Sequence, residues 1–172
     1  MFEIQPMNAE QYRQQTRRST LIVCVILAAL CTLMASLSLT LFGEPGGHNF
    51  RWNLGGVIAG LLLTIAVVRL YLWQQPWMAA AVYGFHLKRN LMKVTNILHK
   101  VETQVAAGDP NAMRVLRFYH LGLIQMHQLE DNQTAISDMI KSIDQHRERM
   151  LAAGLDPEQN RLDPAWLAAL NS

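Results

Sequence analysis

Two apolar stretches of this 172-residue chain decide its fold: Leu21–Phe42, LIVCVILAALCTLMASLSLTLF, and Leu54–Trp73, LGGVIAGLLLTIAVVRLYLW. The first contains no charged residue and the second contains one, Arg69. A helix rises about 1.5 Å per residue, so each stretch is long enough to cross a hydrocarbon core of about 30 Å. We exclude a secretory signal for the first stretch because the apolar core of a signal peptide spans only about 7–15 residues. The sequence therefore predicts two membrane-spanning helices that form an antiparallel hairpin.

Basic residues indicate how this hairpin is oriented. They precede the first stretch and follow the second, whereas the loop at residues 43–53 contains only Arg51, with Glu44 nearby. Segments rich in Lys and Arg stay on the cytoplasmic side. We therefore expect a bacterial inner-membrane protein with both termini cytoplasmic, a cytoplasmic N-terminal segment at residues 1–20 and a periplasmic loop at residues 43–53. The basic side chains expected to contact anionic lipid are Arg17, Arg18, Arg69, Lys88, Arg89 and Lys93.

Small side chains recur at every fourth position in both stretches, a spacing that lets helix backbones approach closely. Two interpretations stay open: the two series close the hairpin on itself, or Gly56 and Gly60 join copies of the chain. A permeation path is less favoured because pores place ionisable groups inside the helix bundle, and this hairpin offers only Arg69. The residues expected on the helix-packing or oligomer face are Thr32, Ser36, Thr40, Gly56, Gly60 and Thr64.

Other polar or reactive side chains in the two stretches have ordinary explanations. Arg69 lies about one turn from the end of the second stretch, so its long side chain can extend to the headgroups. Trp52 and Trp73 fit the aromatic belts found at membrane interfaces. Cys24 and Cys31 are too far apart along one helix for an internal disulfide. We interpret them as small apolar residues, with a cross-link between two chains as the alternative.

The polar part of the chain, residues 77–172, is predicted to be a cytoplasmic helical domain. Apolar residues at a spacing of three and four predict one long helix from Trp77 to Val105, ended by Gly108. A partner could dock on the seam of this helix if part of the seam is exposed. The seam residues singled out are Leu87, Leu91, Val94, Leu98 and Val101.

Asp-Pro pairs indicate where later helices begin, because Asp is a good N-cap and Pro is tolerated in the first turn. Asp109-Pro110 begins a second helix, a third ends at Gly154, and Asp163-Pro164 introduces a short final one. No stretch alternates with period two, so no sheet is expected. The expected fold class is all-α: a transmembrane hairpin followed by an antiparallel bundle of about three helices and a short C-terminal helix.

No catalytic motif accompanies these elements. His120 and His127 share a helix face, but neither belongs to an HExxH or ExxH pattern. We therefore expect no cofactor, no small-molecule substrate and no enzymatic activity. Nucleic acid is not an expected partner, because residues 101–172 carry six Lys and Arg against ten Asp and Glu.

Four stretches carry a resemblance to a known family: GEPGGHNFRWNLGG (43–56), QQPWMAAAVYGFHLKRNLMKVTNILHKVE (74–102), GDPNAMRVLRFYHLGL (108–123) and LDPEQNRLDPAWLAAL (155–170). With them the chain resembles an uncharacterised proteobacterial membrane-protein family, known only as a domain of unknown function. The resemblance covers nearly the whole chain. It implies a Gram-negative inner-membrane protein with two spans and a cytoplasmic helical tail, and it implies no activity, cofactor or catalytic residue.

The sequence therefore favours a non-enzymatic, membrane-anchored interaction module, an adaptor or accessory subunit whose partners are membrane lipids and a protein. A homo-oligomer that shapes or permeates the membrane through its small-residue faces is the alternative. A metalloprotein that uses His120, His127 and acidic residues of neighbouring helices is the third hypothesis.

Overall fold

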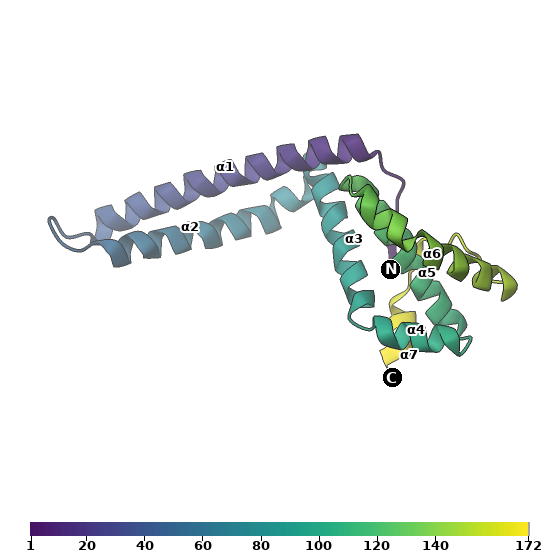
Figure 1. Cartoon of the computed structure of the whole chain (residues 1–172). Helices are drawn as coiled ribbons and strands as arrows, with labels where there is room; N and C mark the ends of the chain where they lie inside the picture. Colours follow the sequence, from purple (N-terminus) through teal and green to yellow (C-terminus); the bar gives the residue numbers. More distant parts are fainter. Residues whose placement is uncertain (172) are drawn as a thin grey trace. The chain divides into compact units, whose positions relative to one another are not determined.

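The computed structural model describes residues 1–171, with the side chains of residues 133–136, 138 and 171 left undescribed. Its described part is helical, as expected, and divides into two compact units. One unit is Gln14–Val82; the other joins Met1–Arg13 to Tyr83–Ser172. The elements, labelled in Figure 1, are β1 (Phe2–Glu3), α1 (Ala9–Phe42), α2 (Phe50–Leu70), η1 (Leu72–Gln74), η2 (Pro76–Met78), α3 (Ala79–Thr95), α4 (Leu98–Ala106), α5 (Pro110–Leu129), α6 (Gln133–Ala152), β2 (Arg161–Leu162) and α7 (Pro164–Asn171).

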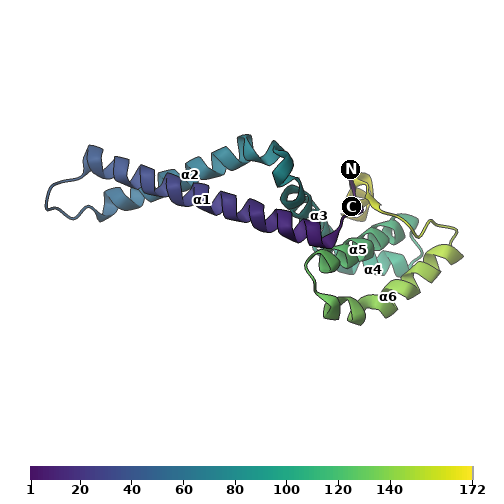
Figure 2. The same cartoon turned by 90° about the horizontal axis from the view of Figure 1, so that it is seen from above.

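The first unit is a hairpin in which α1 and α2 lie side by side and antiparallel (Figures 1 and 2). At its closed end, the Ser38 hydroxyl donates a hydrogen bond to the Trp52 carbonyl over 2.7 Å. Phe42 stacks on the Trp52 ring with centroids 5.0 Å apart. Glu44 and Asn49 exchange two hydrogen bonds of 2.9 and 3.0 Å across the loop. These contacts close a short turn, so the helices leave it packed together.

The outer surface of this hairpin is apolar. Both helices are long and apolar enough to span a membrane, and little of either is covered by the rest of the chain. Only 6% of the most apolar window of α1 and 17% of that of the second helix is buried. A core helix of a soluble protein would be mostly buried instead. Leu33 and Leu62, for example, are 62% and 61% exposed.

The second unit has one hydrophobic core, and α5 lies at its centre. This helix packs against α4, α6 and α7. Asp109 caps its start by accepting a 2.6 Å hydrogen bond from the Ala112 amide, so the start predicted from Asp109-Pro110 is confirmed. Phe118 of α5 and Met150 of α6 are fully buried.

The long helix predicted from Trp77 to Val105 is wrong in one respect, because it breaks between α3 and α4. Thr95 ends α3 and Leu98 begins α4, with Ile97 at φ −121° outside helical geometry. The residues around the break, Val94 to Ile97, are β-branched or Asn, and such residues disfavour helix. The apolar spacing hid the break, because side chains on both sides of it enter the same core.

The expectation of no sheet is also wrong, although the sheet is small. Phe2–Glu3 pairs antiparallel with Arg161–Leu162, and the Ile4 amide donates to the Asn160 carbonyl over 2.9 Å. A 3.1 Å salt bridge joins Glu3 to Arg161. Strands of two residues are too short to show a period-two pattern. Through this pairing the residues that precede α1 join the second unit, Met1–Arg13 with Tyr83–Ser172, which we call the helical unit.

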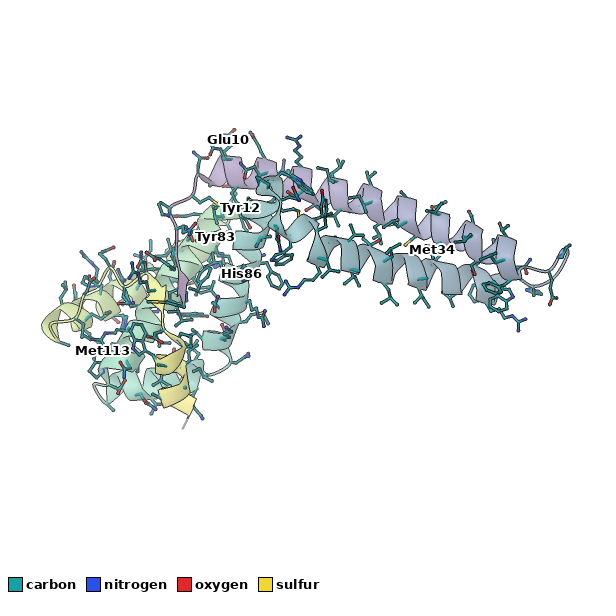
Figure 3. The ribbon with its side chains drawn as sticks, turned by 180° about the vertical axis from the view of Figure 1, so that it is seen from behind. Glu10, Tyr12, Met34, Tyr83, His86 and Met113 are labelled. Carbon is teal, nitrogen blue, oxygen red and sulfur yellow. The ribbon has the colours of Figure 1, made fainter. Side chains whose placement is uncertain are left out.

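Gly84 of α3 provides the space in which Tyr12 packs. A Cβ on Gly84 would clash with the Tyr12 hydroxyl, since it would lie well inside the contact distance of the two atoms. Figure 3 shows Tyr12 and Tyr83 close together where the N-terminal residues meet α3. This close contact helps to hold residues 1–13 against the helical unit.

We predict that Gly84→Ala lowers the unfolding free energy of the full-length protein by about 1 kcal/mol, since overpacking displaces Tyr12. Tyr12→Phe removes the hydroxyl that a Cβ would meet, so adding it to Gly84→Ala should restore part of the loss. Thermal unfolding in detergent measures both effects. Equal melting temperatures for Gly84→Ala with and without Tyr12→Phe would contradict this packing.

Candidate functional site

The glycines of α2 form the contact surface of the hairpin. Gly56, Gly60 and Thr64 are buried in the described structure. A Cβ on Gly56 would lie 2.5 Å from the Ala35 Cα, and one on Gly60 would lie 2.6 Å from the Cys31 Cα. Only glycine allows the backbones to approach this closely. The small-residue series of α2 therefore packs against α1 of the same chain.

The matching series of α1 lies elsewhere. Thr32, Ser36 and Thr40 are all exposed, so the interpretation that both series close the hairpin is wrong for α1. The α1 residues that meet α2 include Cys31 and Ala35, one position before Thr32 and Ser36 and therefore about 100° around the helix. The sequence could not distinguish these faces, because small residues occupy both. An apolar groove of about 630 Å³ follows the outer face, lined by Val25, Ala28, Ala29, Thr32, Leu33 and Ser36.

The seam predicted for partner docking is the core of the helical unit. Leu87, Leu91, Val94 and Val101 are at most 3% exposed, and Leu98 is partly buried against the same core. The chain's own helices cover the seam because α3 and α4 both present it inward. The prediction required part of the seam to be exposed, and the four buried residues do not meet that condition.

All six basic side chains predicted to contact lipid are exposed. In the hairpin unit, the Arg69 guanidinium lies over the Trp73 ring, 5.1 Å from its centroid. In the helical unit, Lys88 forms an ion pair with Glu130, and the Lys93 ammonium donates to Asn90 Oδ1 over 3.2 Å. Arg17, Arg18 and Arg89 are the other three.

The histidine that meets His120 is His146 of α6, and His127 does not take part in this contact. The two rings lie edge to face with centroids 5.3 Å apart, and both are buried. His146 Nε2 lies 3.0 Å from the Met113 carbonyl, which only accepts, so this nitrogen carries a proton. The Nδ1 atoms of both rings are buried and have no hydrogen-bond partner among the residues that the structure describes. A sequence pattern could not identify this pair, because its members come from different helices.

Burial holds both rings neutral. Burial, together with the smaller effects of His146 and Arg117, lowers the pKa of His120 to about 4. Burial also lowers the pKa of His146, partly opposed by its hydrogen bond to Met113. Arg117 is itself buried, and its Nε donates to the Pro157 carbonyl over 2.5 Å. The site is therefore a buried polar cluster in a cationic environment.

A groove of about 220 Å³ lies over this cluster, with Glu102 of α4 and Arg149 of α6 among its lining residues. Within the described part of the chain, no three His, Cys, Asp or Glu side chains are arranged to hold a metal ion. Arg117 beside the two rings also opposes a divalent cation, since it already lowers the pKa of both. The metalloprotein hypothesis gains no support from His120 and His127, which the structure does not bring together.

Comparison with known proteins identifies the family. The chain belongs to the family described as protein of unknown function (DUF3087), whose profile matches residues 2–167. No curated protein and no solved structure matches the chain significantly.

Proposed function

We propose that this chain is a membrane-anchored helical interaction module, an adaptor or accessory subunit at the cytoplasmic face of the bacterial inner membrane. The observation that carries the proposal is the exposed apolar surface of the hairpin. Burying apolar side chains contributes about 25 cal/mol per Å². A surface this long and apolar is stable when lipid covers it, and the side chains of α1 and α2 match that environment.

Aromatic and basic pairs at the two ends of α2 support the same interpretation. The Arg51 guanidinium lies 5.0 Å from the centre of the Trp52 ring, and Arg69 stacks similarly on Trp73. Trp and basic residues are enriched at the two membrane interfaces. Helix α2 itself, 21 residues from Phe50 to Leu70, is about 30 Å long, which matches the thickness of a hydrocarbon core.

The division into units supports a topology with both ends on one side. Residues 1–13 precede the hairpin and residues 83–172 follow it, yet they form one compact unit. Such a unit cannot assemble across a bilayer. Together with the Lys and Arg that flank the hairpin, this favours a cytoplasmic helical unit and a periplasmic loop at residues 43–49.

The experiment that tests the module is in-cell cross-linking, followed by purification of the tagged full-length chain and mass spectrometry of what accompanies it. The proposal predicts that a foreign protein is recovered with the chain in stoichiometric amount. A variant whose core is intact should recover the same amount, and Phe118→Ala, which loosens the helical unit, should recover less. Recovery of the chain without any cross-linked protein would contradict an interaction module.

Self-association is a second candidate, and the groove on the outer face of α1 favours it. Small side chains along this face allow the α1 helix of another copy to approach closely. Ala29 lines this groove, so a cysteine placed there in a protein with Cys24→Ser and Cys31→Ser would face another copy. Cys31 faces α2, with its Sγ 3.6 Å from the Val57 carbonyl oxygen. Cysteines at positions 29 and 31 therefore report on opposite possibilities.

Oxidative cross-linking of membranes distinguishes them. If copies meet through this groove, a disulfide dimer forms with Ala29→Cys as the single cysteine and does not form with Cys31 as the single cysteine. Thr32→Leu, which fills the groove, should reduce the dimer several-fold. Equal dimer yields at positions 29 and 31, or no dimer at position 29, would contradict association through this face.

A further inference from the structure

One face of α3 is exposed and combines apolar side chains with basic ones. Phe85 and Met92 point outward and are 48% and 64% exposed. They are seven residues apart, two helical turns, and therefore lie on the same face. The opposite face carries the buried Leu87, Leu91 and Val94. The exposed apolar pair is therefore a separate surface and no part of the core.

The charge on this face has one sign. Lys88, Arg89 and Lys93 flank the apolar pair and are exposed, and α3 contains no Asp or Glu. Glu130, which follows α5, pairs with Lys88. Within the described part of the chain, neither Arg89 nor Lys93 forms an ion pair with a carboxylate. Apolar side chains bordered by basic ones are typical of helices that lie in a membrane interface.

A cavity beside this face has the same character. It has a volume of about 230 Å³, and the α3 residues that line it are His86, Asn90 and Lys93. The side chains that line it include a basic group and no carboxylate. It therefore extends the region of α3 that suits an anionic group.

We propose that this face of α3 docks on the anionic phospholipid of the bilayer that holds the hairpin. Phe85 and Met92 enter the interface, while Arg89 and Lys93 contact headgroup phosphates. The connection along the chain is short enough for this contact, because α3 begins nine residues after Leu70, the end of α2. This inference rests on the membrane anchoring in the proposed function. It adds a lipid-binding surface outside the hairpin, on α3.

The test uses the full-length protein with Cys24→Ser and Cys31→Ser, carrying one fluorescent label on Met92→Cys. The protein is placed in nanodiscs of phosphatidylcholine alone or with 30% phosphatidylglycerol, each containing lipids with a quencher in the acyl chain. The matched control is a label on Ile140→Cys of α6, which is also an exposed apolar position at 48%.

We expect several-fold stronger quenching at position 92 than at position 140 in anionic discs, and weaker quenching at position 92 without phosphatidylglycerol. Each neutralised charge, in Arg89→Gln or Lys93→Gln, should reduce the docking equilibrium about fivefold. Equal quenching at the two positions would overturn the proposal. It would also be overturned if Arg89→Gln and Lys93→Gln abolished binding of an acidic protein and left the quenching unchanged. Failure of the protein to enter nanodiscs would instead contradict the membrane anchoring itself.

Discussion

Gly60→Ala and Gly56→Ala are expected to open the hairpin, whereas Gly55→Ala leaves it closed. A Cβ at position 56 or 60 would lie 2.5 or 2.6 Å from a Cα of α1, closer than atoms can approach. At Gly55 nothing lies within 4 Å of the added Cβ. Overpacking costs about 1–3 kcal/mol at each tight position, and the helices must separate to relieve it.

Cys31 gives a direct measure of this separation. Its thiol lies against the Val57 carbonyl in the closed hairpin. In a Cys24→Ser background, the rate at which a small maleimide modifies Cys31 should rise about tenfold in Gly60→Ala, the factor that corresponds to about 1.4 kcal/mol. The rate in Gly55→Ala should match that of the parent protein. Equal rates in Gly55→Ala and Gly60→Ala would show that the helices do not meet at this glycine.

Acidification is expected to destabilise the helical unit, and His120 should be the main cause. The folded protein holds the pKa of His120 at about 4, below the 6.5 of an ordinary histidine. The unfolded chain therefore binds more protons between these two values, so stability falls as the pH is lowered. The loss from His120 alone is about 3 kcal/mol between pH 7 and pH 4.

The groups around His120 determine the sign of this effect. Arg117 of α5 and His146 of α6 oppose its protonation, and burial opposes it most. Glu102 of α4 and Arg149 of α6 line the groove above the pair. The pKa of His146 is lowered as well, so its protonation on unfolding adds to the loss in the same direction.

Urea unfolding of the full-length protein at a series of pH values measures the slope. His120→Gln should reduce the loss of stability between pH 7 and pH 4, whatever its effect at pH 7. His99→Gln is the matched control, since His99 is exposed on α4 and lies outside the buried histidine pair. A slope that is the same in wild type and His120→Gln would contradict the lowered pKa.

Local patterns predicted several ends of the helices correctly. The charge-free stretch ends at Phe42, where α1 also ends, and Asp109-Pro110 marks the start of α5. In both cases the cause is local in the sequence. An uninterrupted apolar stretch determines the hairpin helix, and an N-cap followed by proline determines the start of α5. The burial of Leu87 and Leu91 likewise follows the periodicity, although their assignment as a docking seam did not consider which helix would cover them.

The features that the sequence did not predict depend on contacts between distant residues. The strand pairing of Phe2 with Leu162 joins the two ends of the chain through only two residues on each side. The pairing of His120 with His146 depends on the packing of α5 against α6. The outward face of Thr32 depends on a helix rotation that small residues on both faces leave undefined.

The central claim is that the hairpin crosses a membrane and places the helical unit on the side of both termini. Single cysteines at His48 in the loop and Lys141 in α6, both exposed, test it in a protein with Cys24→Ser and Cys31→Ser. We expect a membrane-impermeant maleimide to modify His48→Cys in spheroplasts but to modify Lys141→Cys only after lysis. Equal labelling of both sites in spheroplasts, or release of the protein from membranes by alkaline carbonate, would contradict it.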